Sequence, residues 1–194
     1  MIEAWPGLVS GPAAELIDDS LVLLPFLDDA SRLVDVGSGG GLPGLPLKLL
    51  RPDLQVTLIE SDQDKAAFLI QAAARLRLRG VEVVNRPAEE AGQDARYREA
   101  FDVAVARALA PITVLAELCL PLVRVGGRLL AQKTEREDVS VAHAAFDLLG
   151  GMLEAVTTAP SELRSEGTIV VVRKVAPTPA IYPRRPGLPR RKPL

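Results

Sequence analysis

A short apolar strand that runs into a cluster of glycines is the feature that most constrains this chain. Residues 34–44 read Val-Asp-Val-Gly-Ser-Gly-Gly-Gly-Leu-Pro-Gly, and the pattern predicts a helix from about residue 43 to residue 50. Glycine lets the backbone turn sharply and lets a ligand approach where a Cβ would clash. In a doubly wound α/β sheet, ligands bind at the carboxyl ends of strands, near the point where strand order reverses. The segment therefore predicts a ligand-binding loop in such a sheet.

The rest of the chain alternates strand-like and helix-like segments, as in a mostly parallel sheet with helices on both faces. We expect strands at residues 32–36, 54–60, 81–84, 101–106, 128–132, 152–157 and 168–174. Helices are expected at about 43–50, from a cap at Ser61 or Asp62 to Gly80, at 112–123 and at 139–149. This predicts a Rossmann-like α/β domain with a seven-stranded sheet over residues 31–176. A short helical segment (1–30) precedes it, and a basic, proline-rich tail without periodicity (177–194) follows it.

The glycines fit two nucleotide-binding patterns. Gly39, Gly41 and Gly44 match the dinucleotide fingerprint G-x-G-x-x-G. Gly37, Gly39 and Gly41 match G-x-G-x-G, with Asp35 two residues before the first glycine. The second pattern is that of Rossmann-like methyltransferases, in which the glycines pack against the amino acid part and the ribose of S-adenosylmethionine. The loop alone does not decide between the two.

Acidic residues after the strands give further candidate contacts. Glu60 ends the second predicted strand, 23 residues after Gly37, where nucleotide-binding folds place an acid that accepts hydrogen bonds from ribose hydroxyls. A helix-capping acid is the alternative. Ala88 and Glu89 follow the third strand, beside the adenine in methyltransferases, although Glu89 is equally well explained as a surface acid. Asp35 is interpreted as a carboxylate under the glycine loop that binds loop N–H groups or the ammonium of a cofactor.

Single cysteine and histidine residues narrow the possible chemistry. Cys119 has no partner for an intramolecular disulfide and lies in an apolar helix, so a packing role is expected. His143, the one histidine, is predicted on a helix surface, and a multi-histidine metal site is excluded. No apolar run reaches the roughly 18 residues of a membrane span, and no secretory signal is visible. We expect a cytoplasmic monomer without a metal.

Charge is distributed unevenly along the chain. The whole sequence has 23 basic and 25 acidic residues and a net charge of -2. From residue 173 onward there are seven Lys and Arg residues and no acids, which leaves 16 basic against 25 acidic residues in the remainder. An acidic body with a basic tail suggests that the tail meets a polyanion. A solubilising, disordered end explains the charge equally well.

Four stretches give the chain a resemblance to the RsmG (GidB) family, the guanine-N7 methyltransferases of bacterial 16S ribosomal RNA. They are the glycine loop with its Leu-Pro-Gly-Leu-Pro ending (35–47), Lys-Ala-Ala-Phe-Leu (65–69), Ala-Arg-Ala-Leu-Ala-Pro with the later Pro-Leu and Gly-Gly-Arg-Leu-Leu-Ala-Gln-Lys (106–111, 121–122, 126–133), and the tail (182–194). Members usually have a longer N-terminal helical segment, a basic Arg-His pair before the Asp-Ser-Leu motif and a Lys-Gly where this chain has Lys133-Thr134.

The resemblance implies S-adenosylmethionine as cofactor, with contacts at Gly37, Leu42, Ala88-Glu89 and Arg107, and 16S RNA of the small ribosomal subunit as substrate. Guanine N7 has a lone pair and no proton to remove, so methyl transfer requires positioning rather than a strong base. We expect Arg107 to help position the cofactor carboxylate or the target base, with a structural salt bridge as its alternative. Candidate RNA contacts are Lys133, Tyr182, Arg184, Arg185, Arg190, Arg191 and Lys192.

Three other functions remain open at this point. The first is a dehydrogenase-like dinucleotide-binding protein, for which no catalytic histidine or tyrosine-lysine arrangement is visible. The second is a methyltransferase for a small molecule or a protein, against which the basic tail argues weakly. The third is a non-catalytic ribosome-binding relative. Binding of a dinucleotide rather than S-adenosylmethionine would separate the first from the rest. RNA affinity would separate the second, and turnover the third.

Overall fold

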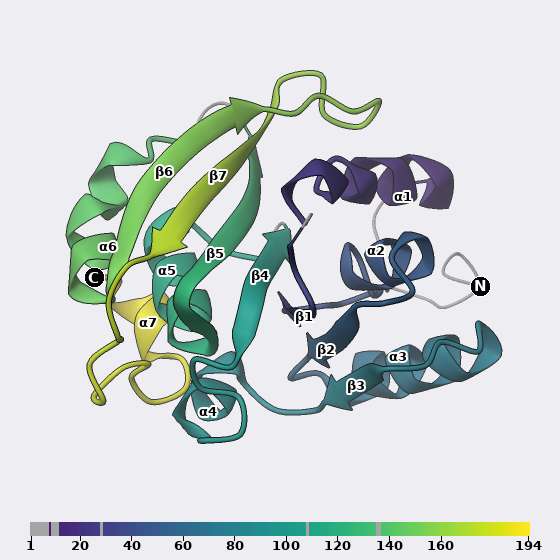
Figure 1. Ribbon diagram of the computed structural model, residues 1–194, viewed down its shortest axis with the longest axis horizontal. Helices are drawn as coiled ribbons and strands as arrows, with labels where there is room; N and C mark the ends of the chain where they lie inside the picture. Colours follow the sequence, from purple (N-terminus) through teal and green to yellow (C-terminus); the bar gives the residue numbers. More distant parts are fainter. Residues whose placement is uncertain (1–7, 9–11, 28, 108, 135–136) are drawn as a thin grey trace.

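A computed structural model describes residues 8, 12–27, 29–107, 109–134 and 137–194. Its centre is a twisted seven-stranded sheet with the order β3-β2-β1-β4-β5-β7-β6 (Figure 1). The pairs from β3 to β5 are parallel, whereas β7 is antiparallel to both β5 and β6. The strands are β1 (Arg32–Val36), β2 (Gln55–Ile59), β3 (Val81–Val84), β4 (Phe101–Arg107), β5 (Val123–Thr134), β6 (Gly151–Thr158) and β7 (Gly167–Lys174). The predicted mostly parallel, seven-stranded sheet is confirmed.

Helices cover both faces of the sheet, as predicted. They are α1 (Ala13–Leu21), α2 (Gly44–Leu50), α3 (Gln63–Arg75), α4 (Ala88–Gln93), α5 (Ile112–Cys119), α6 (His143–Leu148) and α7 (Leu188–Arg191), with short 3-10 turns η2 (Leu24–Phe26), η3 (Leu120–Leu122) and η4 (Ser140–Ala142). One apolar core joins the sheet to α4, α5 and α6, and the other joins it to α2, α3 and the segment after α1. Parallel strands buried on both faces explain the nearly continuous apolar runs in the sequence.

Several local predictions can be checked directly. Asp62 caps α3, because its side chain accepts hydrogen bonds from the backbone of Asp64 and Lys65. The strand predicted at residues 128–132 begins earlier, at Val123, and Gly126 and Gly127 lie within it, where its register against β4 is irregular. A Cβ on Gly127 would stand 2.5 Å from the carbonyl oxygen of Asp102, so only glycine fits this bulge.

The C-terminal segment differs most from its prediction. Residues 177–194 were expected to be irregular, but they fold back against the domain and contain α7. In Figure 1 this segment passes α4 and α5 before it ends near α6. Among the described residues, no helix is long and apolar enough to cross a membrane.

Candidate functional site

The glycine loop connects β1 to α2 at the point where the strand order reverses between β1 and β4. The backbone N–H groups of Gly37 and Ser38 both donate to the carbonyl oxygen of Ile59, at 2.9 and 3.0 Å. Gly37, Gly39 and Gly41 have φ angles of 73°, 52° and 81°, which L side chains rarely adopt. These are the three glycines of the methyltransferase pattern, so each of them is required for backbone conformation.

Gly44 is needed for a different reason. It has no positive φ, but a Cβ there would stand 2.5 Å from Cδ2 of Leu58 and 2.8 Å from Oδ2 of Asp35. Its backbone N–H donates to Oδ2 of Asp35 at 2.9 Å. The glycine therefore allows the carboxylate to approach the start of α2 closely.

Asp35 is a buried carboxylate under this loop. Its Oδ1 is buried and accepts no hydrogen bond. Burial raises the pKa of Asp35 to about 7, and nearby Glu60 adds to this, whereas the Gly44 N–H and the Arg107 charge act in the opposite direction. A buried, unpartnered carboxylate oxygen next to a glycine loop suits a cationic group on a ligand.

Glu60 holds the loop from the neighbouring strand. Its Oε2 accepts a hydrogen bond from Gly39 N at 2.8 Å, and its Oε1 accepts one from Asp62 N at 2.9 Å. Each carboxylate oxygen has two lone pairs, so both can still accept a hydroxyl. Glu60 therefore orders the loop and keeps acceptor capacity for a ribose.

A cavity of about 240 Å³ opens beside the loop. Three of the predicted cofactor residues, Gly37, Ala88 and Glu89, line it together. Leu42 is buried within the loop and does not line this cavity. The C-terminal residues Pro186, Gly187 and Arg190 line it as well. Sequence patterns assigned no cofactor role to these last residues.

A row of polar side chains crosses three neighbouring strands on the face covered by α1. Asp35 on β1, Arg107 on β4 and Gln132 on β5 form it; Arg107 pairs in register with Gln132. Asp35 Oδ1, Arg107 Nε and Gln132 Oε1 are all buried without a hydrogen-bond partner. Buried polar groups in native proteins are nearly always satisfied, so this row is a candidate ligand-contact region.

Asp19 on α1 contacts two members of this row, Arg107 and Gln132. Its fully buried carboxylate is 3.4 Å from Nη1 of Arg107 and accepts from Nε of Arg164 at 2.6 Å. Its backbone carbonyl accepts from Nε2 of Gln132 at 2.6 Å. Arg164 comes from the loop between β6 and β7, which passes over α1 in Figure 1. The salt bridge proposed as the alternative role of Arg107 therefore exists, and it belongs to a larger network.

The predicted RNA contacts fall into two groups. Lys133 donates to the carbonyl of Ala110 and pairs with Glu137 at 2.8 Å, and Arg184 pairs with the fully buried Glu117 at 2.6 Å. Tyr182 is half-buried against the core. A phosphate contact by any of these three would require the existing contacts to open. The others are exposed: Arg185, Arg190, Arg191 and Lys192.

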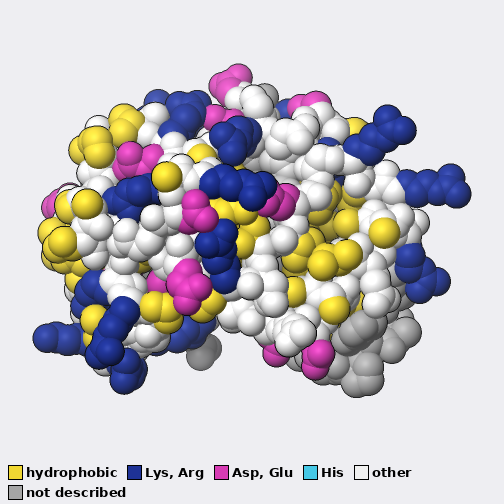
Figure 2. Space-filling view, turned by 90° about the horizontal axis from the view of Figure 1, so that it is seen from below, with side chains coloured by type: hydrophobic (Ala, Val, Ile, Leu, Met, Phe, Trp, Pro, Cys, Tyr) yellow, Lys and Arg dark blue, Asp and Glu magenta, His cyan; other side chains and the backbone are white. Residues whose placement is uncertain are grey.

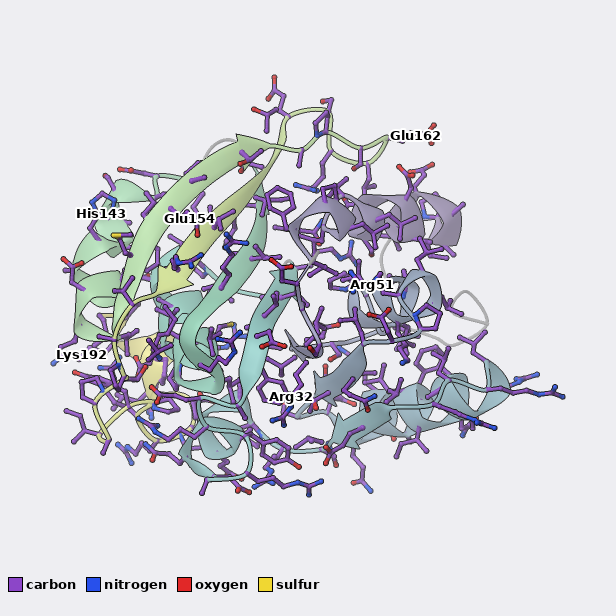
Figure 3. The ribbon with its side chains drawn as sticks, viewed as in Figure 1. Arg32, Arg51, His143, Glu154, Glu162 and Lys192 are labelled. Atoms are coloured by element: carbon purple, nitrogen blue, oxygen red, sulfur yellow. The ribbon has the colours of Figure 1, made fainter. Side chains whose placement is uncertain are left out.

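The views of the surface and of the side chains place some of these residues. Figure 2 shows Lys and Arg side chains at both ends and across the middle of its face, and the group at its lower left lies at the end where Figure 1 places α7. Figure 3 places Lys192 at the outer rim of the molecule and His143 on α6, away from the glycine loop. Cys119 is buried, and burial raises the pKa of its thiol. In the described part of the chain, no cluster of His, Cys, Asp or Glu could hold a metal ion.

Sequence reasoning missed three residues that organise the site: Asp19, Gln132 and Glu117. Glu117 carried a signal, because a lone acid inside the apolar run Leu-Ala-Glu-Leu-Cys-Leu implies a buried partner. Asp19 lies in the Asp-Ser-Leu motif that was compared with the family pattern. Gln132 lies in the stretch 126–133 that carries the family resemblance, but strand periodicity does not tell which polar residue of a strand faces the site.

Comparison with known families now identifies the chain. Residues 13–165 match the family model described as rRNA small subunit methyltransferase G. The chain belongs to this family. Among curated members, ribosomal RNA small subunit methyltransferase G of Roseiflexus castenholzii is 49% identical over 183 residues, covering 92% of this chain and 77% of its own length. The member from Moorella thermoacetica is 44% identical over 184 residues, covering 91% and 75%.

Solved structures support the fold. A ribosomal protein L11 methylase from Lactobacillus delbrueckii superposes with a TM-score of 0.64 at 15% identity, over 88% of this chain and 83% of its own. A SAM-dependent methyltransferase from Aquifex aeolicus gives 0.64 at 17% identity, over 83% and 92%. The O-methyltransferase NcsB1, solved with S-adenosylmethionine, gives 0.60 at 16%, over 75% and 49%. At these identities the likeness shows the Rossmann-like methyltransferase fold of this family.

Proposed function

We propose that this chain transfers a methyl group from S-adenosylmethionine to N7 of a guanine in 16S ribosomal RNA of the small ribosomal subunit. The observation that carries the proposal is the glycine loop with its buried Asp35, beside a cavity at the reversal of strand order, in a chain of the rRNA small subunit methyltransferase G family. The cofactor supplies an electrophilic methyl group on a sulfonium. The chain's own residues then have to bind and align the reactants.

The described residues fit such a cofactor. The cavity between Ile59 and Leu118 is bordered by Ala88 and Glu89, which suits an adenine with a polar edge. Glu60 keeps acceptor capacity near the loop for ribose hydroxyls. Asp35 offers its free Oδ1 to a cationic group.

Arg107 is proposed to act between the cofactor and the target base. It lies close enough to Asp35 to lower the pKa of that carboxyl, while Asp19 holds its Nη1 from the other side. Its buried Nε is unpartnered. Guanine N7 needs its lone pair for the methyl group, so donors on Arg107 would bind the neighbouring O6 or the cofactor carboxylate.

The RNA is proposed to contact the exposed cations Arg185, Arg190, Arg191 and Lys192, with Tyr182, Arg184 and Lys133 reached only after their internal contacts open. Each phosphate that is neutralised releases counterions, so affinity should fall steeply with salt. A flat dependence of RNA affinity on salt would remove the C-terminal segment from the RNA interface.

The test is methyl transfer from radiolabelled S-adenosylmethionine to small subunits and to free 16S RNA from cells that lack the endogenous enzyme. We expect label on one guanine N7. Arg107→Ala should reduce turnover or cofactor affinity, with Arg75→Ala, at the exposed end of α3, as the surface control. Tight binding of S-adenosylmethionine without label would exclude this RNA as substrate, and binding of a dinucleotide instead would exclude the cofactor.

A further inference from the structure

The C-terminal strap, residues 175–194, is attached to the domain by side chains from distant elements. Arg98 donates from Nη1 and Nη2 to the carbonyl oxygens of Tyr182 and Thr178, both at 2.7 Å. Gln93 at the end of α4 donates from Nε2 to the carbonyl oxygen of Pro183 at 2.8 Å. Carbonyl oxygens of an irregular segment need such partners when they turn inward. The first half of the strap therefore has a defined path.

Glu117 on α5 fixes the middle of the strap. Its side chain is fully buried, and it accepts hydrogen bonds from the backbone N, the Nε and the Nη2 of Arg184 at 2.8, 2.8 and 2.6 Å. Nη2 of Arg184 also donates to the carbonyl oxygen of Lys192 at 2.7 Å. This guanidinium therefore joins α5 to both ends of the turn that contains α7, and the fork geometry fixes its orientation.

After Arg184, the strap continues to the cavity. Gly187 N donates to Oε1 of the buried Glu89 at 2.9 Å. Nη2 of Arg190 donates to the carbonyl oxygen of Leu109 at 3.2 Å. Leu109 in turn packs over Gly37, where a Cβ would stand 2.5 Å from its Cδ1. The strap is thus linked through one residue to the first glycine of the loop.

We propose that the strap forms the outer wall of the cofactor site, with Gly187 and Arg190 bordering the adenine nucleoside and with Glu117 and Glu89 as the residues that position it. Pro186, Gly187 and Arg190 line the same cavity as Ala88, Glu89 and Leu118. Glu89 has one carboxylate oxygen on the strap and the other available to the ligand. This inference rests on the proposed cofactor and extends the site to the end of the chain.

Hydrogen exchange of the unaltered chain, with and without S-adenosylhomocysteine, tests the wall directly. We expect slower exchange in a peptide covering residues 184–191 and in a peptide covering the glycine loop. A peptide covering residues 71–80, at the end of α3, lines no part of this cavity and serves as the unaffected reference. Protection of the glycine loop alone would overturn the strap proposal and leave the proposed function standing. Protection of neither would overturn the cofactor assignment itself.

A pair of variants on the same short helix provides the second test. Arg190 and Arg191 are both exposed, but only Arg190 lines the cavity and contacts Leu109. We expect Arg190→Ala to weaken binding of S-adenosylhomocysteine by about tenfold or more, the cost of losing one hydrogen bond from a charged group. Arg191→Ala should change it less than about twofold. Titration calorimetry measures the affinity of both variants for S-adenosylhomocysteine. An equal loss of affinity in the two variants, or no loss in Arg190→Ala, would refute the role of the strap.

Discussion

The two sides of the cavity are built in opposite ways. The glycine loop is held through its own backbone N–H groups by residues close by in the sequence, such as Gly37 N to the Ile59 carbonyl and Gly39 N to the Glu60 carboxylate. The strap is held by charged side chains from far away in the sequence: Glu89 lies 98 residues from Gly187, and Glu117 lies 67 residues from Arg184. The stability of the loop side depends on the φ angles of its glycines and on the room around them. The stability of the strap side depends on buried charges, each of which is costly when its partner is removed. Substitutions should therefore destabilise the two sides through different physical effects.

The largest expected effect comes from removing one member of the buried ion pair. Arg184→Ala leaves Glu117 buried without a partner and should destabilise the chain by about 3–5 kcal/mol. Urea unfolding measures this free energy. The double variant Glu117→Gln with Arg184→Met removes both charges and should recover much of the loss. A cost below about 1 kcal/mol for the single variant would contradict a buried ion pair between Arg184 and Glu117.

An intermediate effect is expected from alanine at glycines with positive φ on the two sides. At Gly41, φ is 81° and the Cβ would stand 2.4 Å from Cδ1 of Leu45, so strain and overpacking add to about 2–3 kcal/mol. At Gly187, φ is 77° but the Cβ meets open space, so only about 1 kcal/mol is expected. If the two variants lose the same free energy of unfolding, measured by thermal unfolding, then the room for a Cβ does not distinguish the two sides.

The smallest effect is a pH dependence specific to the loop side. Burial raises the pKa of Asp35 from 3.8 to about 7, so between these values the unfolded chain releases this proton first and stability falls as pH rises. Asp35→Asn lacks this slope and can still accept from Gly44 N. We expect it to gain about 2 kcal/mol relative to the parent chain as the pH rises from about 4.5 to about 6, which is about 1.4 kcal/mol per pH unit. Parallel stability curves from urea unfolding would contradict the raised pKa.

The same contrast explains what could be predicted. The strands, the Asp62 cap and the glycine pattern follow from local periodicity and backbone geometry, so sequence patterns predict them well. Gly37, Ala88 and Glu89 are predicted as cofactor contacts from the sequence, and the three line one cavity in the structure. Arg190 was assigned to RNA alone, because a basic, proline-rich end without periodicity resembles a tail.

The remaining features depend on tertiary contacts. The path of the strap is decided by Arg98 and Glu117, whose partners are distant in the sequence. The network of Asp19 joins α1, β4, β5 and the loop after β6, four elements that no local pattern brings together. Such residues are visible in a sequence only as polar positions inside apolar elements, and that signal does not name the partner.

The position of the strap also bears on when the site is assembled during synthesis. Domains fold as the chain emerges, N-terminal parts first, so β1 and the glycine loop leave the translating ribosome early. Gly187 and Arg190, which border the same cavity, are translated about 150 residues after Gly37 of the glycine loop. A nascent chain therefore lacks one side of its cavity until the strap has left the exit tunnel.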